Sequence, residues 1–125
     1  MKVYPISLAL ILIFVMCPDA FSQKCKERVP RDRPFTNRGG PKITRKPQPE
    51  YTEEARKRQV QGTVLLRALF DSSGEVKNVC WVDGLPYGLT ENAIKAAYKI
   101  TFEPVIKNGH PVSVTIFVGY DFNLY

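Results

Sequence analysis

Apolar and polar residues alternate in several stretches of the second half of the chain, which is typical of β-strands with one buried face. The clearest stretch is residues 112–120, where valine or isoleucine stands at every second position as far as 118, and the alternation continues through Tyr120 to the chain end. It predicts a half-buried antiparallel strand. Two earlier stretches, residues 63–70 and 75–82, are rich in apolar and β-branched residues and predict two further strands.

A turn at residues 71–74, with glycine at its last position, joins the two earlier strands. In the return strand, Val76 and Val79 are an odd number of residues apart, so strict alternation would put them on opposite faces. A β-bulge near residues 77–78 would bring both to the buried face. The same bulge would turn Cys80 outward.

Two other segments have the spacing of helices. Thr52 is suited to cap a short helix over residues 52–59, whose first turn is acidic and last turn basic, as the helix dipole favours. A second helix is expected over residues 90–98. Its core-facing side would hold Ala93, Ile94, Ala97 and Tyr98. The order helix, strand, strand, helix, strand predicts an α+β fold: a small antiparallel three-stranded sheet with two helices on one face.

The first 22 residues have the pattern of a secretory signal peptide. Lys2 supplies a positive charge, residues 3–16 are almost entirely apolar, and Ala20 and Ser22 are small residues at the positions that signal peptidase reads. We expect cleavage after Ser22 and export of the remainder. The alternative is an uncleaved membrane anchor, although the apolar run is shorter than the ~20 residues that span a bilayer.

The net charge of +6 is concentrated in one segment. Residues 23–46 carry nine Lys/Arg and two Asp/Glu, whereas residues 47–125 carry eight Lys/Arg and nine Asp/Glu. With few large apolar side chains, the Pro- and Gly-rich residues 23–46 are expected to be a flexible linker before a domain at 47–125. In an exported protein its basic charge favours weak contact with anionic lipid or cell-wall polymer, and not nucleic acid. A solvated spacer is the alternative.

The residue types that carry catalysis or bind metals are scarce. Cys25 and Cys80 would remain after signal cleavage, either as a disulfide or as two unrelated thiols, and they lack the spacing of a redox motif or metal site. His110 is the only histidine and lies in an expected surface turn, without a predicted orienting partner. There is no Gly-rich phosphate loop or nucleophile elbow. We therefore expect no enzyme, no catalytic residues, no metal and no cofactor.

Several short motifs occur in order between residue 49 and residue 124. They are Pro49-x-Tyr51, Glu54-Ala55-Arg56, Val60-Gln61-Gly62-Thr63-Val64, Asp71-x-x-Gly74-x-Val76, the helix alanines 93, 96 and 97, Phe102-x-Pro104, Asn108-Gly109-x-Pro111-Val112 and Phe122-x-Leu124. In number, order and spacing these motifs resemble the C-terminal domain of TonB-type energy transducers.

The resemblance implies a periplasmic domain that binds an extended segment of an outer-membrane transporter, or of another envelope protein, by strand addition at a sheet edge. The edge would be the last strand. The implied partner-binding residues are Val112, Ser113, Val114, Thr115, Ile116, Phe117 and Val118, with accessory contacts from Gln48 and Tyr51. Proline at residue 114 or 116 would then be expected to remove a backbone donor needed for binding. An unpaired last strand also predicts a homodimer through that edge.

Three features depart from the family pattern. The usual Tyr-Pro dipeptide is Tyr51-Thr52, and the apolar residues 3–16 lack the histidine that couples full-length transducers to a motor. Residues 23–46 would also span at most roughly 80 Å when fully extended, which is short for a periplasmic spacer. The alternative to a role in TonB-dependent transmembrane transport is therefore a free periplasmic interaction or self-associating module without energy transduction.

Overall fold

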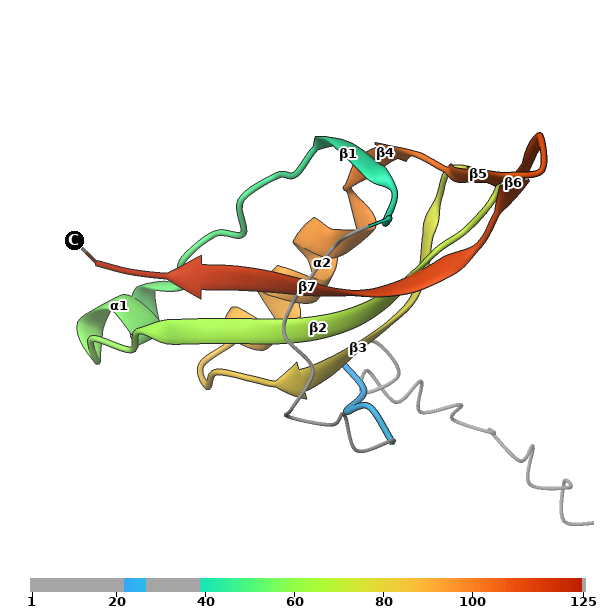
Figure 1. Ribbon diagram of the computed structural model, residues 1–125. Helices are drawn as coiled ribbons and strands as arrows, with labels where there is room; N and C mark the ends of the chain where they lie inside the picture. Colours follow the sequence, from blue (N-terminus) through green and yellow to red (C-terminus); the bar gives the residue numbers. More distant parts are fainter. Residues whose placement is uncertain (1–21, 27–38, 125) are drawn as a thin grey trace, which may run out of the picture.

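The computed structural model describes residues 22–26 and 39–124, so the predicted signal peptide and most of the predicted linker lie outside the described residues. The central element is a three-stranded antiparallel sheet in the order β3-β2-β7. In Figure 1, β2 (Gly62–Phe70) runs between β3 (Val76–Asp83) and β7 (Val114–Phe122). The sequence predicts these three strands, and the α+β fold class is confirmed.

Two helices accompany the sheet. The longer one, α2 (Leu89–Tyr98), lies across one face of the sheet and contacts β2 and β3 (Figure 1). The shorter one, α1 (Glu53–Lys57), lies at one end, beside the start of β2. It begins where the sequence predicted, because the Oγ1 of Thr52 accepts a hydrogen bond from the backbone N–H of Ala55 at 3.2 Å.

The core lies between α2 and the sheet. Alternate residues of β2 are fully buried, and α2 adds a stripe of small and branched side chains. The fully buried members from these two elements are Val64, Leu66, Ala68, Phe70, Leu89, Ala93, Ile94 and Ala97. One expectation was wrong: Tyr98 is 43% exposed, while Ala96 is buried. Tyr98 is the last residue of α2, and its hydroxyl accepts a hydrogen bond from the N–H of Val79 in β3 at 3.3 Å.

The predicted bulge is present in β3. Leu69 stands opposite Lys77 and Arg67 opposite Cys80, so that one extra residue of β3 is accommodated between these pairs. Asn78 has a φ of 51°, which allows the strand to turn locally. Val76 and Val79 are consequently both buried, as predicted from their spacing.

A further strand lies inside the segment that was expected to be a flexible linker, which corrects that expectation for its last residues. Strand β1 (Lys42–Arg45) pairs with β4 (Thr101–Glu103) and places Ile43 opposite Phe102, against the core. The hydroxyls of Thr44 and Thr101 are 2.9 Å apart. A single large apolar residue suffices because its partner strand supplies the rest of the packing.

The last predicted strand is divided in two. Asn108 and Gly109, with φ of 51° and 78°, form the tight turn between β5 (Val105–Lys107) and β6 (His110–Val112). Val112 therefore pairs with Val105 in this hairpin and not in the central sheet. The edge expected over residues 112–120 is corrected to Val114–Phe122.

Candidate partner-binding edge

Strand β7 forms one border of the central sheet. Its register with β2 is continuous from Val114 opposite Phe70 to Phe122 opposite Gly62. Among the strands of residues 22–26 and 39–124, it pairs with β2 and with no other. An edge strand with a long, regular ladder on one side has the geometry that strand addition requires.

The hydrogen bonds of Trp81 show which residues of β7 direct their backbone groups toward β2 and which direct them away from it. Both its N–H and its C=O bond outside the central sheet, to the C=O of Gln23 at 2.9 Å and the N–H of Cys25 at 2.8 Å. Leu66, which is opposite Trp81, must therefore direct its own backbone groups to β7 and Val118. Because direction alternates along a strand, Val114, Ile116, Val118, Tyr120 and Phe122 bond to β2.

Thr115, Phe117, Gly119 and Asp121 accordingly direct their backbone groups to the outer side of β7. An independent contact agrees with this assignment. The Nζ of Lys46 donates to the C=O of Gly119 at 2.7 Å, from a segment that runs along the side of β7 away from β2 (Figure 1).

The segment between β1 and α1 covers one end of this edge. Lys46 lies with its Nζ 4.7 Å from the ring centroid of Tyr120, and burial lowers the pKa of its ammonium, opposed in part by Asp121. Tyr51 packs edge-on against Phe122 at 5.4 Å and donates from its hydroxyl to the C=O of Val60. The covered end is thus the part of β7 after Gly119, and Thr115 lies beyond it.

The predicted binding residues divide between the two faces of the sheet. Val114 and Ile116 pack against the core and Val118 is 3% exposed, so their side chains are structural. Thr115 is exposed and Phe117 half-buried on the opposite face. Of the accessory residues, Gln48 is exposed, whereas Tyr51 is half-buried and fixes the covering segment.

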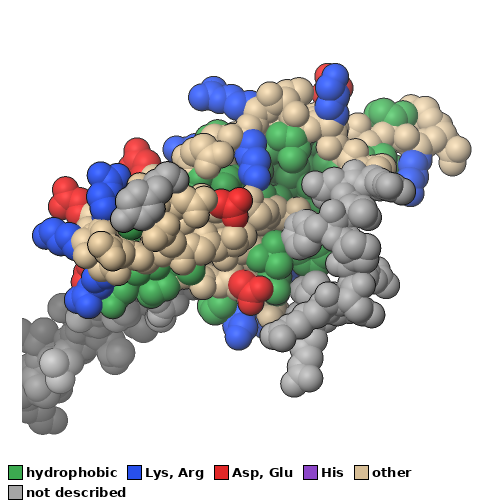
Figure 2. All heavy atoms as spheres, turned by 60° about the vertical axis from the view of Figure 1, so that its left-hand side comes forward, with side chains coloured by type: hydrophobic (Ala, Val, Ile, Leu, Met, Phe, Trp, Pro, Cys, Tyr) green, Lys and Arg blue, Asp and Glu red, His purple; other side chains and the backbone are tan. Residues whose placement is uncertain are grey.

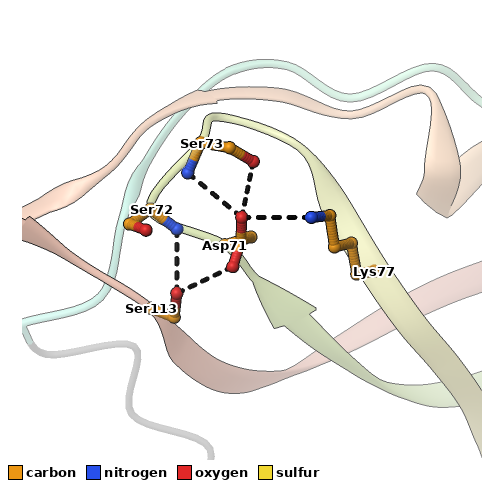
Figure 3. Close-up of polar contacts among 5 residues, drawn as sticks. All are labelled: Asp71, Ser72, Ser73, Lys77 and Ser113. Atoms are coloured by element: carbon orange, nitrogen blue, oxygen red, sulfur yellow. Dashed lines mark hydrogen bonds and ion pairs between the residues drawn. The ribbon is translucent and has the colours of Figure 1, made fainter.

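The hydroxyl of Ser113, which was predicted to contact a partner, anchors the start of β7 (Figure 3). It donates to Oδ1 of Asp71 at 2.9 Å and accepts from the N–H of Ser72 at the same distance. Asp71 also accepts from the N–H and Oγ of Ser73 at 3.2 and 2.5 Å, and Lys77 lies 3.3 Å away. The β2–β3 turn and the first residue before β7 are therefore held together by one carboxylate.

These contacts give a pH-dependent stability. The hydrogen bonds of Ser73 and Ser113 hold the pKa of Asp71 well below its usual value. A depressed folded-state pKa means that this stabilisation is complete above the unfolded pKa of about 3.9 and is lost as the pH falls below it. We expect thermal midpoints of Asp71→Asn, measured between about pH 6 and pH 2, to fall less steeply with acid than those of the wild type.

The matched control for this prediction is Asp83→Asn, which changes an exposed carboxylate at the end of β3. Its pH profile should follow that of the wild type. Parallel profiles for the wild type and Asp71→Asn would contradict the role given to Asp71.

The opposite edge of the sheet is occupied. Residues 23–25 run beside β3, with a parallel bridge between Lys24 and Trp81. Cys25 and Cys80 form a disulfide with a Cα–Cα distance of 5.0 Å. From the sequence, both a disulfide and two unrelated thiols were open for these cysteines, and no sequence signal predicted the backbone pairing of residues 23–25.

Other chemistry is sparse in the part of the chain that the structure describes. His110 is exposed, and no three His, Cys, Asp or Glu residues among those described are grouped to hold a metal ion. No helix within these residues is long and apolar enough to cross a membrane. Acidic and basic side chains are interspersed on the face in Figure 2, which does not form the single-sign surface typical of nucleic-acid binding.

These elements define a class: a small α+β domain whose antiparallel sheet has α2 on one face and an edge strand along one border. The family described as Gram-negative bacterial TonB protein C-terminal matches residues 47–124, which is more than half of the chain. The chain therefore belongs to the TonB C-terminal domain family. Members of this family are envelope-associated and take part in TonB-dependent transport, interacting in general with outer-membrane transporters.

A solved structure agrees with this assignment. The solution NMR structure of the Pseudomonas aeruginosa TonB CTD is similar with a TM-score of 0.56 and 22% identity, covering 67% of this chain and 86% of that chain. At this identity the likeness supports the fold alone. No curated protein matches the chain.

Proposed function

We propose that this protein docks an extended segment of an outer-membrane transporter, or of another envelope protein, by adding it as a strand to the outer side of β7. The observation that carries the proposal is the direction of the backbone groups of β7, which alternate between β2 and the outer side over nine paired residues. Thr115 offers its N–H and C=O where the covering segment does not reach. The partner's backbone would supply the complementary groups.

Export completes the proposal. Residues 1–22 would be a secretory signal, and the mature chain would act in the periplasm. A disulfide between Cys25 and Cys80 supports this placement, because such bonds persist in oxidising compartments. No catalytic role is proposed, since the TonB C-terminal domain family is a transport-related family without enzymatic activity.

Site-specific photo-cross-linking in cells tests the docking edge. A photoreactive amino acid replaces Thr115 on β7 in one strain and Lys77 on β3 in another, and cross-linked products are identified by mass spectrometry. We expect the label at residue 115 to capture the extended segment of an outer-membrane transporter and the label at residue 77 to capture none.

Two results would overturn the proposal. Equal capture at both positions would place binding elsewhere than the β7 edge. Capture of only a second copy of this chain at residue 115 would identify β7 as a self-association edge.

A further inference from the structure

The edge formed by β3 is closed by the chain itself, and the contacts are those of an added strand. Trp81 donates to the C=O of Gln23 at 2.9 Å and accepts from the N–H of Cys25 at 2.8 Å. Lys24, between them, forms the parallel bridge with Trp81. In a parallel ladder, a residue bonds to the two residues on either side of the one opposite it. Trp81 does this, because it is opposite Lys24 and bonds to Gln23 and Cys25.

Side chains reinforce this backbone pairing. The Nζ of Lys24 lies 5.3 Å from the ring centroid of Trp81, within the range of a cation–π contact. The bulge near Asn78 turns Cys80 to the face opposite the core, where it bonds to Cys25. The segment is therefore held by its backbone, by one ring contact and by one covalent bond.

The covalent bond accounts for the persistence of so short a strand. Two backbone hydrogen bonds over residues 23–25 gain too little to offset the entropy of ordering the segment. The disulfide compensates for this entropy cost, because it keeps the segment beside β3, at a high effective concentration, whenever the hydrogen bonds break.

We propose that the β3 edge is a second strand-accepting edge, that residues 23–25 are its resident strand, and that the Cys25–Cys80 disulfide locks that strand in place. The lock opens when a dithiol transfers two electrons and two protons to the S–S bond, which yields the two cysteine thiols and the oxidised dithiol. This inference concerns the border opposite β7 and holds whether or not β7 binds a transporter.

Disulfide exchange with a synthetic peptide tests whether the edge recognises a strand or only a thiol. The mature chain carrying Cys25→Ser keeps the Cys80 thiol. It is equilibrated at low temperature with a peptide of residues 22–27, which contains the native cysteine, over a series of 2-mercaptoethanol concentrations. The control peptide is identical except for N-methylation at its cysteine, which removes the donor to the C=O of Trp81.

We expect the unmodified peptide to remain attached to Cys80 at roughly tenfold higher 2-mercaptoethanol than the N-methylated peptide, the effect of one lost hydrogen bond. The protein's own segment competes equally with both peptides. Equal retention of the two peptides would show that β3 holds only the sulfur, and would overturn the inference.

A second measurement uses the wild-type protein and does not depend on the folding of a variant. In the oxidised protein the Trp81 amide should exchange with solvent at least about tenfold more slowly than the Thr115 amide on the outer side of β7. A Trp81 amide that exchanges as fast as that of Thr115 would equally contradict the strand-accepting role of β3.

Discussion

Ile116→Pro should unfold the domain under conditions in which Thr115→Pro, one residue earlier, leaves it folded. The N–H of Ile116 belongs to the ladder with β2, and its loss leaves the opposing C=O of Ala68 without a donor in the middle of the sheet. We expect the free energy of unfolding to fall by about 3 kcal/mol or more. The N–H of Thr115 points outward, so Thr115→Pro should cost less than about 1 kcal/mol. Thermal and urea unfolding followed by circular dichroism measure both.

Alanine variants separate the backbone from the side chain in this comparison. Ile116→Ala and Thr115→Ala keep the N–H, so the difference between each proline variant and its alanine counterpart isolates the hydrogen bond. Thr115→Pro should also reduce affinity for the captured transporter segment by about tenfold, the effect of one edge hydrogen bond, while Thr115→Ala should change it little. A destabilisation of Thr115→Pro as large as that of Ile116→Pro would show that the assigned direction of β7 is wrong.

The direction of the backbone hydrogen bonds of β7 could not be predicted from the sequence, although the direction of its side chains could. The alternation of apolar residues predicted correctly which side chains of β7 face the core, because burial and side-chain direction share a period of two. The hydrogen-bond direction also has a period of two, but it depends on which neighbouring strand lies on which side. Proline at 114 or 116 was therefore the wrong choice to test binding, since Val114 and Ile116 bond to β2.

The parts of the fold that the sequence missed depend on partners far along the chain. Ile43 is nearly alone among polar residues, and its burial comes from Phe102 across β1 and β4. The alternation of apolar and polar residues continues through Ser113 without a break. In the structure, however, β6 ends at the residue before Ser113 and β7 begins at the residue after it, and the Ser113 hydroxyl bonds to Asp71. By contrast, the bulge in β3 was predictable, because the spacing of Val76 and Val79 is a local conflict with one geometric solution.

Removing the disulfide should have the largest effect on stability of any change outside the core. Cys25 and Cys80 are separated by 55 residues, and for a loop of that length the chain-entropy relation gives a contribution of about 4 kcal/mol. Domains of this size are stable by only about 5–15 kcal/mol. The double variant Cys25→Ser/Cys80→Ser should therefore unfold roughly 15–30 °C below the wild type, measured by calorimetry without reductant.

Two controls make this result specific to the covalent bond. The wild type with dithiothreitol should melt at the temperature of the double variant, and the reductant should not shift the double variant further. Lys24→Ala removes the contact with the Trp81 ring but keeps the disulfide, and should lower stability by about 1 kcal/mol or less. If the double variant melted within about 5 °C of the wild type, the disulfide would contribute much less to stability than the chain-entropy relation gives.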